Sequence, residues 1–136
     1  MNSEETDANH DLSSLDILLF TVDEVLCGMD GGLIGRMLLL DEAVDSKVQL
    51  RWFHQALSFG ERPVFYQNPW VVTMKGVAEV SGLVIDQPLD LVKLSPRAIC
   101  PMPAFFALTE GLRVYWGAFM FNERVVLLID PYQLLA

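Results

Sequence analysis

The stretch GAFMFNERVVLLIDPYQLLA, residues 117–136, decides the fold that this sequence predicts. Chain ends fray unless packing holds them, so a terminal stretch this rich in Val, Leu and Ile is expected to dock into a core. Apolar runs lie on both sides of the polar dipeptide Asn122-Glu123. Residues 113–121 and 124–129 are therefore predicted to be two strands of a hairpin that turns at this dipeptide.

A short helical turn is expected after the hairpin. Asp130 stands where a helix N-cap belongs, and Pro131 follows at the first helical position, where its missing N–H costs nothing. Leu134 and Leu135 would then form the apolar face of this last turn. No pattern of a long helix occurs elsewhere, so the chain is predicted to be mainly β.

Further short strands are predicted upstream of the hairpin. Turn residues separate apolar or alternating runs at residues 15–22, 25–29, 70–74, 77–80, 83–86 and 89–94. Two further segments combine helical and strand patterns. Residues 33–40 suggest a short helix or irregular turn before a strand, and residues 48–57 suggest a strand that runs into a helical turn. Ser81-Gly82 is expected to kink its strand, which favours a small, tightly curved barrel.

Composition and charge narrow the classes of partner. The 136 residues are 52% hydrophobic and 20% charged, so a core is available and some apolar surface is expected to need a partner or a second copy. The net charge of −9 disfavours nucleic acid and anionic membranes, which bind clustered Lys and Arg. No apolar run is long enough to span a membrane.

The first residues predict a tail and a location. Residues 1–14 carry four acids and no Lys or Arg, which is the opposite of a secretory leader. They also lack periodic apolar positions, so we expect a disordered acidic tail before one domain over residues 15–136. The protein is expected to be cytoplasmic.

Residues able to carry catalysis or hold a metal are few. His54 is the single histidine of residues 15–136, and its aromatic neighbours favour a surface or core position over a general base. Cys27 and Cys100 lie far apart without metal-ligand spacing, which predicts two buried free thiols. Patterns of a nucleophile elbow, a phosphate loop or a calcium loop are missing. The sequence therefore predicts no enzyme, no catalytic residue, no cofactor and no metal.

Three groups of residues follow one another in the order of a known family. They are Phe20-Thr21-Val22-Asp23-Glu24 through Gly28-Met29 to Ile34 and Met37; Ser81-Gly82-Leu83-Val84-Ile85-Asp86 with Leu91-Val92-Lys93-Leu94 and Pro101-Met102-Pro103; and Gly117 with Val125-Val126-Leu127-Leu128-Ile129-Asp130 and Leu134-Leu135. Together they resemble the CheW-like domain, the adaptor module of bacterial chemosensory arrays. The resemblance implies two small SH3-like β-barrel lobes packed on each other, which work by binding.

One family segment is missing from this chain. The family places a proline-containing turn and an N-L-R-G segment within the first barrel, whereas here Leu40 runs directly into the acidic residues 41–47. We therefore expect this lobe to be shortened. A lobe that lacks strands has an unpaired edge, and such an edge tends to recruit another chain. A homodimer, or a dedicated partner that completes the lobe, is the resulting hypothesis.

The resemblance implies a signalling adaptor that binds a CheA-type histidine kinase, a chemoreceptor or both through apolar barrel surfaces. Carried over residue by residue, the kinase-facing strand pair of the family corresponds to Met29, Ile34 and Met37. Some aromatic residues are expected to be exposed there as anchors. The alternative is a self-associating β-domain that has lost these partners and serves as a structural module or binds a small ligand between the lobes.

Overall fold

The computed structural model describes residues 14–56, 63–77 and 81–135. Within these residues the chain forms ten strands in two sheets, joined by short α-helices and 3-10 turns. The prediction of a mainly β chain is confirmed. The predicted strand at 77–80 and the predicted tail at 1–14 lie outside the described residues, apart from Val77 and Ser14.

The larger sheet has six strands in the order β7-β1-β2-β10-β9-β8. It consists of β1 (Leu15–Val22), β2 (Val25–Asp30), β7 (Asp90–Leu94), β8 (Cys100–Pro101), β9 (Tyr115–Phe121) and β10 (Arg124–Ile129). The terminal hairpin β9–β10 is antiparallel as predicted, and β10 joins β2 in parallel. The last strand of the chain is thereby placed in the middle of the sheet, which explains its apolar sequence.

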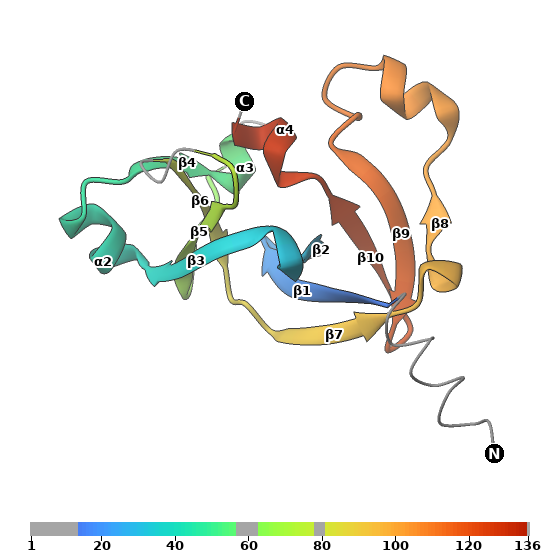
Figure 1. Ribbon diagram of the computed structural model, residues 1–136, viewed down its shortest axis with the longest axis horizontal. Helices are drawn as coiled ribbons and strands as arrows, with labels where there is room; N and C mark the ends of the chain where they lie inside the picture. Colours follow the sequence, from blue (N-terminus) through green and yellow to red (C-terminus); the bar gives the residue numbers. More distant parts are fainter. Residues whose placement is uncertain (1–13, 57–62, 78–80, 136) are drawn as a thin grey trace.

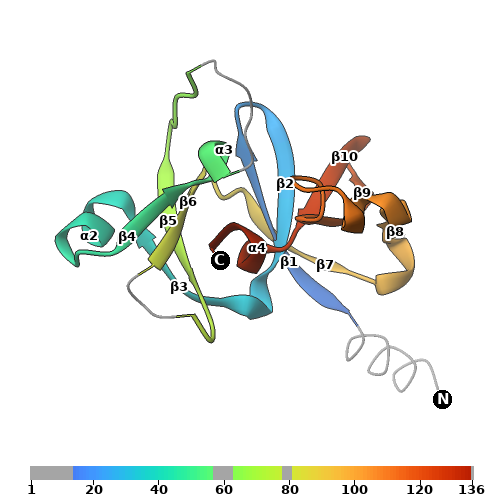
Figure 2. The ribbon, with the colours of Figure 1, turned by 90° about the horizontal axis from the view of Figure 1, so that it is seen from above.

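The smaller sheet has four strands in the order β3-β5-β6-β4. It consists of β3 (Ile34–Leu39), β4 (Gln49–Trp52), β5 (Pro69–Met74) and β6 (Ser81–Asp86). The two sheets lie towards opposite ends of the molecule's longest axis, with α4 between them (Figures 1 and 2). The smaller sheet agrees with the prediction of a shortened lobe. The detailed closure of each lobe as an SH3-like barrel stays a prediction.

Short helical elements connect the strands. They are α2 (Leu40–Asp45), α3 (Phe53–Ala56), α4 (Pro131–Leu135) and the 3-10 turns η1 (Gly31–Leu33), η2 (Pro96–Ala98) and η3 (Ala104–Leu108). The mixed segments 33–40 and 48–57 were predicted correctly, since η1 precedes β3 and α3 follows β4. Helix α2 was not predicted from the sequence. It is too short for a periodic pattern, and the Glu42 carboxylate stabilises its start by accepting the backbone N–H of Leu39 at 3.1 Å.

The core of the described residues consists of three apolar clusters, one of which lies between the two sheets. The cluster between the sheets comprises Leu18, Phe20, Val22, Cys27, Met29, Phe53, Val72, Met74, Leu83, Ile85, Val114, Ile129 and Leu134. On the other face of the six-stranded sheet lie Ile17, Leu19, Leu26, Leu94, Phe119, Val126 and Leu128. On the other face of the four-stranded sheet, under α2, lie Leu38, Ala43, Val71 and Val84. Strand β1 is therefore buried on both faces, which is why its sequence is almost continuously apolar.

The kink predicted at Ser81-Gly82 stays a prediction, because residues 78–80 before it lie outside the described residues. Strand β6 begins at Ser81, and Gly82 pairs in regular register with Leu50 of β4. The glycine also allows close packing, because a Cβ on Gly82 would lie 2.4 Å from Val71 Cγ1. A missing side chain in a strand marks either a bend or a close approach, and the sequence alone does not separate the two.

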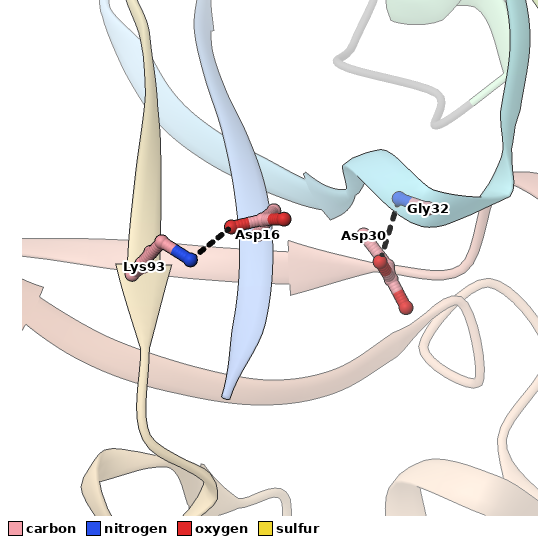
Figure 3. Close-up of polar contacts among 4 residues, drawn as sticks. All are labelled: Asp16, Asp30, Gly32 and Lys93. Carbon is pink, nitrogen blue, oxygen red and sulfur yellow. Dashed lines mark hydrogen bonds and ion pairs between the residues drawn. The ribbon is translucent and has the colours of Figure 1, made fainter. Parts of the chain in front are cut away.

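Figure 3 shows two polar contacts, one where the chain leaves β2 and one across the β1–β7 pair. The carboxylate of Asp30 accepts the backbone N–H of Gly32 at 2.9 Å and so starts η1, which leads from β2 into β3. Across the β1–β7 pair, Lys93 Nζ lies 3.9 Å from Asp16 Oδ1. Both side chains are exposed, so this ion pair contributes little to stability.

The last helix confirms the predicted cap. Asp130 Oδ1 accepts the backbone N–H of Tyr132 at 3.0 Å, and Pro131 opens α4 as expected. Leu134 is buried in the cluster between the sheets, and Leu135 packs against its margin. The end of the chain is thus part of the core.

Candidate functional site

The outer face of the terminal hairpin is a candidate contact surface. Along β9 Gly117 and Phe119 are buried, and Trp116 and Met120, which lie on the opposite face of the strand, are 38% and 63% exposed. Val125 of β10 is paired with Met120 and is 56% exposed. We call Trp116, Met120 and Val125 the hairpin face.

The tryptophan of this face is held in place. Its indole Nε1 donates to the carbonyl oxygen of Ile129 at 3.2 Å, next to the register shift in β10 between Leu128 and Ile129. An aromatic ring that is fixed before binding loses little entropy when a partner covers it, and Trp is among the residues that contribute most to protein interfaces. The hairpin face therefore has a pre-positioned aromatic anchor.

A second exposed apolar surface lies on β3. Met37 is 37% exposed and Leu39 is 44% exposed, and Arg36 beside them is also exposed. Strand β3 pairs with β5 on one side and is the outer strand of its sheet. We call Arg36, Met37 and Leu39 the β3 edge.

The three partner-binding residues predicted from sequence occupy different environments. Met29 is fully buried in the cluster between the sheets, so its assignment to a contact surface is corrected to a core position. Side chains along β2 alternate between its two faces, and the face that carries Cys27 and Met29 is covered by the four-stranded sheet. Ile34 is half-buried at the margin of the same cluster, while Met37 lies on the β3 edge. Partner binding by Ile34 and Met37 stays a prediction.

The two thiols differ. Cys27 is buried, and burial raises the pKa of its thiol to about 12. Cys100 is exposed, so the prediction that both thiols are buried is wrong for Cys100. It lies on the two-residue edge strand β8, which pairs with β9 on one side. A thiol that stays protonated at neutral pH is a poor nucleophile, so Cys27 is inert where it lies.

His54 is engaged in a local contact. The Tyr66 hydroxyl accepts the backbone N–H of His54 at 3.1 Å and lies 2.9 Å from the ring Nδ1. Trp52 stacks edge-on against Tyr66, with 4.9 Å between the ring centroids. Burial is the main reason that the pKa of Tyr66 is raised to about 12. The three aromatic rings thus fix the junction of β4 and α3 to the segment that enters β5.

The hollows on the surface are open and polar or small. One hollow, of about 840 Å³, is lined by Thr21, Asp23, Glu24, Pro63, Phe65, Gln67, Asp86, Gln87 and Arg124. A hollow of about 380 Å³ beside Trp116 is lined by Met102, Phe106 and Tyr115 among others. Within residues 14–56, 63–77 and 81–135, no three His, Cys, Asp or Glu side chains are grouped to hold a metal ion. In the same residues, none of the helices has the length and apolar character to cross a membrane.

No protein-family model and no curated protein matches the chain. The structure is similar to the crystal structure of the scaffolding protein TtCheW from Thermoanaerobacter tengcongensis, with a TM-score of 0.66. The similarity covers 85% of this chain and 88% of that chain, at 14% sequence identity. The chain has a CheW-like fold. The resemblance found in the residues is thus confirmed at the level of the CheW-like fold.

The hairpin face was not identified from the sequence. The segment YWGAFMF of β9 is apolar at every position, so alternation between a buried and an exposed face leaves no polar signal. The sequence did predict that some aromatic residues would be exposed as anchors, and Trp116 is one of them. Only the pairing of β10 with β2 decides which face is covered.

Proposed function

We propose that this CheW-like chain is a non-enzymatic adaptor of a bacterial chemotaxis-type system. It binds a CheA-type histidine kinase, a chemoreceptor or both, and it acts in the cytoplasm. The observation that carries the proposal is the likeness of fold, over most of both chains, to a protein described as a scaffold. Exposed apolar side chains on two separate elements support it.

An adaptor needs separate contact surfaces for separate partners. The hairpin face and the β3 edge belong to different sheets, which lie towards opposite ends of the long axis (Figures 1 and 2). Two partners on these surfaces would be held apart by the body of the domain. We assign the kinase or receptor to the hairpin face, because this face combines a fixed tryptophan with the more exposed apolar side chains Met120 and Val125.

The titratable side chains support a binding role over a catalytic one. The Cys27 thiol is buried and protonated, and the Tyr66 hydroxyl is occupied by His54. The acids Asp23 and Glu24 line a hollow of about 840 Å³ that is open to solvent and whose lining includes no histidine. General acid–base chemistry needs such groups to converge on one substrate, which these residues do not do.

A binding assay tests the proposal. The regulatory domain of the organism's own CheA-type kinase and the cytoplasmic tip of its chemoreceptor are each titrated against the full chain, with a standard CheW as the positive control. We expect wild type to bind at least one of them. Met120→Lys places a charge in the centre of the hairpin face and is expected to weaken binding at least about ten-fold, because a charge is costly to bury.

Leu89→Lys is the matched control, because Leu89 is 53% exposed, similar to Val125, but lies beside β7. It should bind as wild type does. Equal affinities for Met120→Lys and Leu89→Lys would remove the hairpin face from the proposal. If wild type binds neither protein while the standard CheW binds both, the adaptor role is lost. A self-associating β-domain is the competing function, and the open β3 edge favours it.

A further inference from the structure

Strand β3 is an exposed edge along most of its length. It is six residues long and pairs with β5 on one side. Four of its six residues, Gly35, Arg36, Met37 and Leu39, are exposed. An outer strand presents alternate N–H and C=O groups away from its sheet, and proteins usually protect such strands with proline, bulges or several charges. β3 has no proline, and Arg36 is its one charged residue. Its pairing with β5 is irregular between Ile34 and Arg36, so residues 36–39 are the regular part of this edge.

Charge is distributed unevenly along this edge. Near the start of β3 lie Arg36 and Lys75, whose backbone N–H donates to the carbonyl of Leu33 at 2.9 Å. Helix α2 begins directly after β3 and carries Asp41 and Glu42 in its first turn. The next basic residue along the chain is Lys47. One end of the edge is therefore basic and the other is acidic.

We propose that β3 pairs in antiparallel fashion with β3 of a second copy of this chain, so that the two four-stranded sheets join into one. A two-fold axis perpendicular to the sheet relates such strands, and it leaves each face of the sheet continuous across the junction. Antiparallel pairing brings the basic end of one edge beside the acidic end of the other, twice by symmetry. The inference goes beyond the adaptor function and does not depend on it.

The two charged groups also lie on the same face of the sheet. Leu38 points into the cluster that contains Ala43 of α2, so α2 covers the Leu38 face of β3. Arg36 is two residues before Leu38 and therefore has its side chain on that face. When the two Leu38 residues lie opposite each other, Arg36 of one copy lies opposite Leu40 of the other, directly before its Asp41. In this register the Leu39 N–H pairs with Met37 of the second copy in place of its present bond to the Glu42 carboxylate. Neither Arg36 nor Asp41 makes an ion pair with another of the described residues.

A second copy fits this edge better than an unrelated acidic or basic protein would. With a net charge of −9, two copies repel each other over most of their surfaces, so self-association needs a local cation that meets a local anion. The β3 edge supplies both. On its other face Met37 and Leu39 meet their counterparts and lose exposed apolar surface.

Charge reversal tests the pairing by analytical ultracentrifugation of the full chain over a range of concentrations. Wild type is expected to be a dimer. Arg36→Glu and Asp41→Lys each place like charges together twice, so each variant is expected to weaken dimerisation by about ten-fold. An equimolar mixture of the two variants should restore the dimer, because both contacts of the mixed pair are then between opposite charges. Arg97→Glu makes the same charge change on η2 of the other sheet and should leave the dimer intact.

Several outcomes would overturn the inference. A monomeric wild type at the highest soluble concentration would do so, and so would a dimer that both variants leave unchanged. A mixture that is no more dimeric than its two components would rule out the Arg36–Asp41 contact and with it this register. If Arg36→Glu abolishes binding of the kinase domain while wild type alone is monomeric, the edge belongs to that partner. Kinase binding that Arg36→Glu leaves unchanged supports separate surfaces for the two partners.

Discussion

The hydroxyl of Tyr132 donates a hydrogen bond to the backbone carbonyl oxygen of Lys75 at 2.6 Å. Tyr132 belongs to α4, and Lys75 directly follows β5 of the four-stranded sheet. The backbone N–H of Tyr132 is itself held by the carboxylate of Asp130. The end of the chain therefore connects the β9–β10 hairpin, which precedes it, to the other sheet.

Loss of this hydroxyl is expected to weaken the connection. Tyr132→Phe keeps the ring and removes the hydrogen bond, so the free energy of unfolding should fall by about 0.5–1.5 kcal/mol. Urea denaturation measures the change. Tyr115→Phe is the matched control, since the Tyr115 hydroxyl makes no hydrogen bond with another described residue, and it should change stability less. Equal effects of the two substitutions would contradict a role for the Lys75 contact.

The elements that local chemistry determines were predictable from the sequence. The hairpin turn at Asn122-Glu123 and the cap at Asp130 depend on residues close in the chain, and both are found in the structure. Strands bounded by turn residues were likewise located within a residue or two, as for β1 and β5. Short-range rules suffice where the partners of a residue are its neighbours.

Features that depend on distant contacts were not predictable. Met29 was assigned to a surface, but β2 is covered on that face by strands of the other sheet, which are encoded later in the chain. The close approach of Gly82 to Val71 likewise joins two strands, and the sequence does not show it. When both faces of a strand are apolar, periodicity does not tell which face meets the core.

Gly82→Ala is expected to destabilise the four-stranded sheet. A Cβ on Gly82 would lie 2.4 Å from Val71 Cγ1 and 3.1 Å from Val48 Cγ1, so one of these side chains must move. Overpacking of this kind costs about 1–3 kcal/mol of unfolding free energy. Val71→Ala removes the nearer methyl groups, so the double variant should be more stable than the sum of the two single effects implies. Strict additivity in urea denaturation would show that the clash is relieved elsewhere.

The turn of the terminal hairpin offers a stabilising substitution. Asn122 and Glu123 have φ angles of 49° and 65°, the left-handed conformation that a two-residue hairpin turn requires. Glycine adopts this conformation without strain, so Glu123→Gly should raise the free energy of unfolding by about 0.5–1 kcal/mol. Glu110→Gly, at a position outside the left-handed region, should leave stability unchanged or lower it. A loss of stability in Glu123→Gly would contradict this description of the turn.

The buried thiol predicts how stability depends on alkaline pH. Burial raises the pKa of Cys27 from 9.0 to about 12, so the unfolded chain releases this proton at a lower pH than the folded chain does. The unfolded state then binds fewer protons, and the free energy of unfolding falls as pH rises from about 9 towards about 12. Below about pH 8 this group has almost no effect on the slope. Between about pH 8 and 9.5 the fall due to Cys27 should be about 0.8 kcal/mol, whereas Tyr66 and Tyr115, whose pKa values are raised from 10.0, contribute mainly at higher pH.

Urea midpoints of three proteins test this dependence. Cys27→Ala removes the titrating group, so its stability should change much less than that of wild type between about pH 8 and 9.5, although it is lower throughout because a small cavity remains. Cys100→Ala removes the exposed thiol instead and should keep the slope of wild type. Thiol-specific labelling at about pH 8 gives an independent reading: Cys100 should react in the native protein, and Cys27 only after denaturation. A slope that survives in Cys27→Ala would mean that another group titrates in this range. Rapid labelling of Cys27 in the native protein would show that the contact between the two sheets opens far more easily than its fully buried side chains imply.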